Sequence, residues 1–216
     1  MRKKLLVFGA AVAGVVGAGA ILWLRSGPDP SQFAALTTPR FARLSSQRML
    51  VVDAVGDPTF VSGKAIALLF KAYFKTDGVS RMQAPPAPRA RWSFSPDTPR
   101  SKWIGQFALP IGDKVTSAST VESASELNVT LKTWDYGDVA EVVHIGAYSN
   151  EEADIARLND FIKSSGYRSV GEHEEEYVRG PGMVFTGDPQ KYITIIRVRV
   201  VSAPQNEEGT LGDTHS

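Results

Sequence analysis

The sequence contains no cysteine. This absence excludes disulfides, cysteine-ligated zinc, iron–sulfur clusters and a thiol nucleophile. The chain also has no glycine-rich phosphate loop, no nucleophile elbow and no Ser/His/Asp set with distinctive spacing. The usual sequence signatures of phosphoryl and acyl transfer are therefore missing.

A marked excess of charge of either sign is missing too, because the net charge is +1 over 216 residues. The first 25 residues hold four basic side chains and no acid, so the rest carries 20 basic and 23 acidic side chains. A nucleic-acid binder needs a basic face, and we therefore expect no nucleic-acid partner. The apolar content of 43% is that of an ordinary globular chain, which can bury a core.

The amino terminus contains an uncharged run of 20 residues, 5–24, preceded by basic residues 2–4. As a helix this run would span the ~30 Å hydrocarbon core of a bilayer. Residues 18–20 resemble a signal-peptide cleavage site, but the apolar run continues beyond them, which favours an uncleaved anchor. The basic residues place the amino terminus in the cytoplasm. We therefore expect a single-pass membrane protein whose folded domain is extracytoplasmic, or periplasmic in a bacterium.

A strand–helix–strand–strand pattern occurs twice in the remaining chain. The pattern predicts an α+β fold of duplicated modules with pseudo-twofold symmetry, in which two helices cover one face of an antiparallel sheet. The first helix is expected from Ser62 to Thr76, and the second from a capping box of Ser149 and Glu152. The expected divisions are an anchor (1–25), a linker without regular structure (26–39), module one (40–111), a bridge (112–127), module two (128–201) and a disordered tail (202–216).

The two modules can be aligned by residue spacing. Trp92 lies four residues before Pro96, and Tyr177 lies four residues before Pro181. On this register Glu175 corresponds to Ala90, so one module has a carboxylate where the other has a methyl group. Such an asymmetric acid is typical of a ligand pocket, while sequence drift on a solvent-facing strand is the alternative interpretation.

Several motifs of the second module follow one another in the order of a known family. They are His144-Ile145-Gly146-Ala147-Tyr148, the helix after it, Gly166-Tyr167, and Glu175-Glu176-Tyr177 with Pro181 four residues after the tyrosine. In this order and spacing the chain resembles the GyrI-like (gyrase-inhibitor-like) small-molecule-binding domains, as in the effector-binding half of multidrug-responsive regulators. The resemblance covers residues 40–200. The last strand departs from the family pattern, because Thr194-Ile195-Ile196 lacks the usual acid.

The resemblance implies a cleft between the modules, lined by aromatic rings and holding a buried carboxylate. Such a cleft suits amphipathic, often cationic ligands, because aromatic faces attract cations and a carboxylate in low dielectric attracts them strongly. Strand geometry places Glu175 and Tyr177 on one face, and Glu174 and Glu176 on the other, where we expect them to be solvated. The predicted ligand-binding residues are Glu175, Tyr177, Tyr148, Trp92 and Trp103.

The function predicted from these features is a membrane-anchored domain that binds a small amphipathic molecule, with the membrane contacted through residues 5–24. A hydrolase of the same fold, with Glu175 as general base, and a partner-binding domain without a small ligand are the alternatives. His144 is expected to bond a neighbouring backbone group, and His173 to lie on an exposed acidic strand. The related haem-associated SOUL fold would need an axial ligand, which neither histidine obviously supplies. We expect no metal and no cofactor.

Overall fold

A computed structural model describes residues 28–79, 84–93, 98–118, 127–181 and 187–204. The eight strands of this part form one antiparallel sheet in the order β1-β6-β8-β7-β3-β4-β2-β5. The strands are β1 (Arg40–Leu44), β2 (Gln47–Val55), β3 (Arg89–Ser93), β4 (Ile104–Pro110), β5 (Val129–Trp134), β6 (Gly137–Ile145), β7 (Tyr167–Arg179) and β8 (Ile193–Ser202). The α+β class and the antiparallel sheet predicted from the sequence are confirmed.

The strand order is symmetrical about the central β7–β3 pair. Counting outward, the first half of the chain gives β3, β4 and β2, and the second half gives β7, β8 and β6. Each half then receives the first strand of the other, because β5 pairs with β2 and β1 pairs with β6. At the centre, Ala90 lies directly opposite Glu175. The two residues that the sequence register equates are therefore cross-strand partners.

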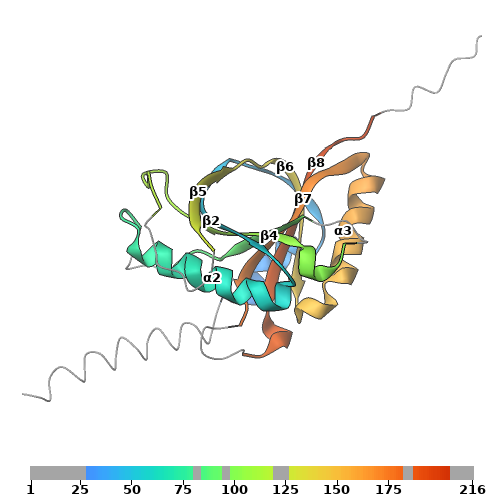
Figure 1. The fold of residues 1–216 in the computed structure, drawn as a ribbon. Coiled ribbons are helices and arrows are strands. Elements are labelled where there is room, and N and C mark those ends of the chain that lie inside the picture. Colours follow the sequence, from blue (N-terminus) through green and yellow to red (C-terminus); the bar gives the residue numbers. More distant parts are fainter. Residues whose placement is uncertain (1–27, 80–83, 94–97, 119–126, 182–186, 205–216) are drawn as a thin grey trace, which may run out of the picture.

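Two α-helices pack on the outer face of the curved sheet (Figure 1). Helix α2 (Pro58–Lys75) contacts β2 and β4, and α3 (Glu152–Ser164) contacts β6 and β7. Leu69 of α2 and Leu158 of α3 are each at most 2% exposed. Burial of such a side chain contributes about 1.5–3 kcal/mol, so these two apolar stripes hold the helices to the sheet.

Helix starts differ from the sequence prediction. Asp57 caps α2 by accepting a hydrogen bond from the Thr59 amide at 2.9 Å, five residues before the predicted cap at Ser62. The predicted capping box of Ser149 is absent, because Ser149 lies in a 3-10 turn, η3 (Tyr148–Asn150), and α3 begins after it without a side-chain cap. The extra turn moves Glu151 inward, which matters for the site.

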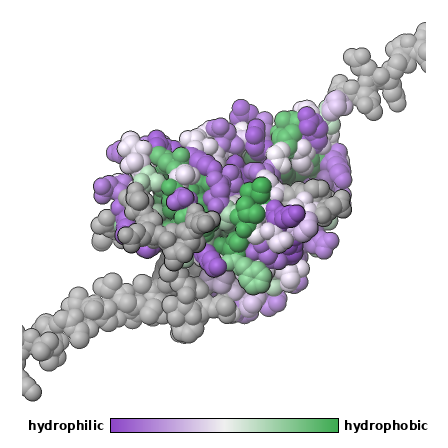
Figure 2. All heavy atoms as spheres, viewed as in Figure 1, coloured by the Kyte–Doolittle hydropathy of each residue, from purple (hydrophilic) through white to green (hydrophobic). Residues whose placement is uncertain are grey.

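The predicted linker is partly regular, contrary to our expectation. A 3-10 helix, η1 (Pro30–Leu36), is capped by the side chain of Asp29. Leu36 packs against Val143, Ile193 and Ile195 on the inner side of the sheet. The linker therefore covers part of that face rather than separating the domain from its surroundings. The view in Figure 2 shows a largely hydrophilic surface with separate apolar patches.

The membrane predictions are corrected. Within the part of the chain that the structure describes, no helix combines the length and apolarity needed to cross a bilayer. The apolar run that suggested an anchor, residues 5–24, lies outside that part. The expected single-pass topology and the membrane partner depended on this run alone, and we retain neither.

Candidate functional site

Glu175 lies at the middle of the sheet, on the face that carries the helices. The alternation of β7 places its side chain with His173 and Tyr177, and the facing residue on β3 is the small Ala90. The Tyr177 hydroxyl donates to Glu175 Oε2 at 2.6 Å, and His173 Nε2 lies 3.2 Å from Oε1. The side chain remains 16% exposed. The carboxylate is thus held in place by its own strand while staying in contact with solvent.

Aromatic rings extend to both sides of Glu175. Trp92 and Trp103 have ring centroids 6.2 Å apart, and the Trp92 side chain hydrogen-bonds Tyr177. The Tyr177 ring lies 5.6 Å from that of Tyr148. The structure therefore brings together all five residues that the sequence singled out, although they come from β3, β7, η3 and the loop before β4. Their role in binding stays a prediction.

Tyr148 is the most accessible ring of this group, with 38% of the residue exposed. It also contacts the Tyr192 ring in a tilted arrangement, at 5.2 Å between centroids. Its hydroxyl end lies against Gly180, where an added Cβ would come within 2.5 Å of the oxygen. Burial of the hydroxyl raises the pKa of Tyr148, with nearby Glu151 adding to the effect. The phenol therefore stays protonated and can donate a hydrogen bond at any ordinary pH.

The Tyr177 hydroxyl also stays protonated, for a related reason. Burial raises its pKa well above the usual value, and the adjacent Glu175 carboxylate raises it further. A protonated Tyr177 keeps donating to Glu175. The short bond between them is therefore maintained over the physiological range.

Glu151 is the acid of this site that the sequence interpretation missed. An acid at this position, just before a helix, ordinarily complements the helix dipole from the solvent-facing helix end. It is instead only 6% exposed, and its Oε1 is buried without a hydrogen-bond partner in the described part of the chain. Burial raises the pKa of Glu151 to about 8, and the nearby Glu175 adds to the rise, while Thr194 opposes it in part. A signal was available in the spacing, because Glu151 follows Tyr148 by three residues, one turn of a 3-10 helix.

The two histidines of the described residues lie in different surroundings. His144 contacts the Asp154 carboxylate through Nδ1 at 2.8 Å and the Ala147 carbonyl through Nε2 at 3.1 Å. Both ring nitrogens are occupied, so His144 connects β6 to α3, and its predicted backbone bond is present. His173 lies beside Glu175 rather than on an exposed acidic strand. No cluster of three or more potential metal ligands exists among the residues that the structure covers.

The expectation that Glu174 and Glu176 are solvated is wrong. Glu174 is 2% exposed, and the Glu176 side chain is 17% exposed. They face the inner side of the curved sheet and pair with Arg89, Arg91 and Arg197. The predicted alternation of side chains along β7 is correct, but the inner face is enclosed because the sheet curves around it.

Structural comparisons identify the fold. An uncharacterised conserved protein from Listeria innocua superposes with a TM-score of 0.64 at 21% identity, covering 80% of this chain and 97% of that protein. A hydrolase from the same organism also gives a TM-score of 0.64 at 21% identity, covering 79% and 95%. The EcmrR C-terminal domain gives 0.58 at 14% identity, covering 77% of this chain and 98% of that domain.

In its complex with DNA, EcmrR gives a TM-score of 0.60 at 12% identity, covering 89% of this chain and 65% of EcmrR. No protein-family profile matches the chain, and no curated protein matches it. At these identities the similarities establish the fold alone. They support the GyrI-like fold that the sequence motifs indicated, and they lend no support to its fusion with a membrane segment.

Proposed function

We propose that this chain is a small-molecule-binding domain that holds an amphipathic cation against Glu175, between α2 and α3. The observation that carries the proposal is a partly open carboxylate inside a set of aromatic rings. A cation that stacks on a ring gains from the negative ring face, and the gain increases when the site excludes water. Tyr148 offers such a face at the solvent-exposed end of the group.

The charge of the site points the same way. Among the described residues, the ion-pair contact of Glu175 is with His173, whose Nε2 lies 3.2 Å from Oε1. A ligand cation would compensate the Glu175 carboxylate more completely than a histidine, which is charged only when protonated. The rings supply apolar contact area for the ligand, and the Glu175 carboxylate orients its cationic group.

Two further observations support this proposal. The strand order is symmetrical about the β7–β3 pair, and Glu175 lies on this pair opposite Ala90, so the acid occurs on one side only. The duplicated modules and their seam, expected over 40–111 and 128–201, remain our interpretation of this symmetry. The EcmrR C-terminal domain shares the fold over 98% of its length.

The test is calorimetric titration with the flat aromatic cation proflavine, and with neutral acridine as a probe of nearly the same shape. We expect saturable binding of proflavine and weaker binding of acridine. Glu175→Gln removes the charge but keeps the shape, and should weaken proflavine binding roughly tenfold to a hundredfold, as expected for a hydrogen-bonded or paired charge. The acridine affinity should change little.

The matched control is Glu152→Gln, which removes an exposed acid from the first turn of α3. It should leave both affinities unchanged. Equal losses of proflavine affinity in the two variants would show that general surface charge, not Glu175, attracts the dye. Unchanged affinity in Glu175→Gln would remove the proposed role of that carboxylate.

Hydrolysis is the second candidate function, and two observations favour it. Two of the similar structures, both from Listeria innocua, are of hydrolases, and the site contains two acids of which Glu151 has a raised pKa. Pairs of acids in different environments commonly divide the acid and base roles. Glu175 would accept a proton from water as the water oxygen attacks an ester carbonyl, and the alkoxide would leave with a proton from a neighbouring donor. Turnover of an activated aromatic ester, lost in Glu175→Gln while acridine binding persists, would establish this activity.

A further inference from the structure

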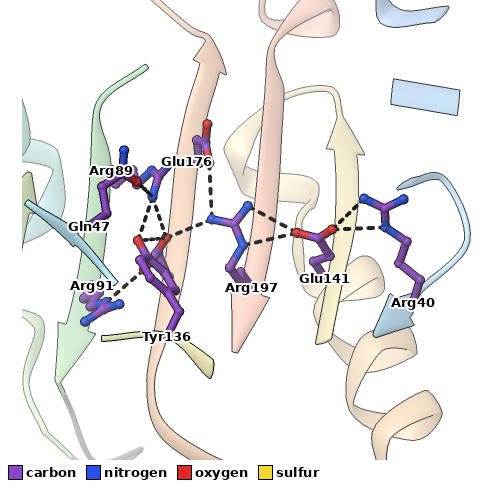
Figure 3. A network of polar contacts seen from close by, with 9 residues as sticks. Arg40, Gln47, Arg89, Arg91, Tyr136, Glu141, Glu176 and Arg197 are labelled. Atoms are coloured by element: carbon purple, nitrogen blue, oxygen red, sulfur yellow. Dashed lines mark hydrogen bonds and ion pairs between the residues drawn. The ribbon is translucent and has the colours of Figure 1, made fainter. Parts of the chain in front are cut away.

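The inner face of the curved sheet carries a network of charged side chains that the proposed function does not use (Figure 3). Arg197 is at its centre, with Nη1 2.9 Å from Glu174 and 3.2 Å from Glu176, and Nη2 3.2 Å from Glu141. Arg197 is 6% exposed, and Glu141 and Glu174 are 3% and 2% exposed. Buried charges of this kind are costly unless they are paired. The network therefore belongs to the interior of the fold, and its charges depend on one another in a way that exposed ion pairs do not.

Positive charge exceeds negative charge in this network. Three carboxylates, Glu141, Glu174 and Glu176, are shared among four guanidinium groups, those of Arg40, Arg89, Arg91 and Arg197. Burial opposes the charge on Arg197, but the surrounding carboxylates outweigh it, so its pKa lies above the usual value. Burial also raises the pKa of Tyr136 to about 12. Its phenol therefore remains protonated, and its hydroxyl donates to Glu174 Oε1 at 3.0 Å.

A cavity of about 430 Å³ opens onto one side of this network. Arg89, Tyr136 and Arg197 line its inner part, and none of the three glutamates of the network does so. Exposed residues of the β1–β2 turn and of the segment after β4 form the mouth: Ser45, Ser46 and Asp113. The charged groups that line the cavity are thus two buried or half-buried guanidinium groups, both paired with Glu176, and one exposed carboxylate.

Hydrogen-bond donors prevail in the lining. Arg89 Nη1 donates to Gln47 at 3.1 Å and to the Tyr136 hydroxyl at 2.6 Å. Arg89 Nε is buried and has no hydrogen-bond partner among the described residues. A buried donor without a partner is unfavourable, and an acceptor atom entering the cavity would relieve that cost. Planar guanidinium groups suit oxyanions, because two N–H groups can bind two oxygens of a carboxylate or phosphate.

We propose that this cavity is a second binding site, which takes a small molecule through a carboxylate or phosphate group held by Arg89 and Arg197. The volume suits an occupant of on the order of ten non-hydrogen atoms, at about 30 Å³ for each water-sized group. The site is separate from that at Glu175, because neighbouring residues of β7 point to opposite faces of the sheet. The inference does not depend on the function proposed above.

The test uses inorganic phosphate and citrate as separate probes, titrated into the full chain by calorimetry in a buffer of low chloride. A phosphate-selective site would bind phosphate more tightly, and a carboxylate-selective site would prefer citrate; saturable binding of either supports the proposal. Absence of saturation up to about 10 mM, beyond the range of specific recognition, would overturn it.

Two pairs of variants locate the binding. Arg89→Gln should weaken binding roughly tenfold or more, because a charge-assisted contact is lost. The control Arg43→Gln removes a guanidinium from an exposed pair with Asp138 and should have no effect. Equal weakening in both would show non-specific attraction and would contradict the site.

The second pair keeps the proposal testable if Arg89→Gln fails to fold. Ser45→Asp places a negative charge at the exposed mouth and should weaken anion binding several-fold, while Ser45→Asn has nearly the same shape and should not. Because Ser45 is exposed, neither change disturbs the core. Identical affinities in Ser45→Asp and Ser45→Asn would place the anion elsewhere and refute the assignment.

Discussion

The buried carboxyl of Glu151 makes the stability of the fold depend on pH in a definite direction. Its pKa is about 8 in the folded chain and 4.5 in the reference state. The folded state therefore binds a proton more tightly than the unfolded state between these values. Since stability falls with rising pH wherever the native state binds more protons, Glu151 destabilises the fold progressively from about pH 4.5 to pH 8.

The size of this effect follows from the shift. At 1.36 kcal/mol per pKa unit, a rise from 4.5 to about 8 corresponds to about 4–5 kcal/mol at most. The interval from pH 5 to pH 8 covers only part of this titration, so we expect a loss of about 2–4 kcal/mol between these two values. Such a loss is a large part of the 5–15 kcal/mol that a typical domain possesses.

Glu151→Gln removes the titration while keeping a side chain of the same shape. Urea unfolding at pH 5, 6.5 and 8 should show that the variant gains stability relative to the parent chain as the pH rises. The amide can lose stability through an unpaired N–H, but that offset does not depend on pH. The control Glu152→Gln changes an exposed neighbour and should give a difference that stays nearly constant. A constant difference for Glu151→Gln as well would refute a buried, titrating Glu151.

Two other changes test the packing around each site. Gly180→Ala should push the Tyr148 ring out of place, since the new Cβ would lie 2.5 Å from its hydroxyl, and proflavine affinity should fall several-fold; Gly63→Ala, which meets nothing within 4 Å, should not alter it. Arg197→Met should lower the free energy of unfolding by about 3–5 kcal/mol, because it removes the guanidinium group that contacts all three carboxylates of the network. Arg43→Met, at an exposed pair, should cost less than about 1 kcal/mol in the same urea titration. Equal effects of the members of either pair would contradict the reasoning.

Much of the fold follows from local pattern. The alternation in β7 separates Glu175 and Tyr177 from Glu174 and Glu176, and the structure keeps that division. The register that equates Ala90 with Glu175 is reflected in their pairing. These predictions succeed because a strand's period of two and the spacing of its motifs are properties of neighbouring residues.

The wrong predictions concern which segments cover each face of the sheet. The local sequence pattern does not contain this information. The sequence predicts that Glu174 and Glu176 face solvent, because it does not show which strands pair with β7 and which charges those strands bring. The arginines that compensate them come from β3 and β8. Glu151 reads as a helix-end acid, but the turn η3 delays the helix start and rotates the residue inward. Both errors arise where distant segments meet, and the local pattern of residues does not specify such contacts.

The segment of β7 from Glu174 to Tyr177 is bounded by two irregularities, where its pairing with β8 shifts between Val170 and Glu174 and between Tyr177 and Arg179. A slip by one position would carry Glu175 toward the guanidinium groups and move Glu174 among the aromatic rings, with no arginine beside it. The register of this strand is thus fixed by the charge of its side chains as well as by their hydrophobicity. A misaligned pairing of this strand would therefore carry an electrostatic cost as well as the loss of apolar packing.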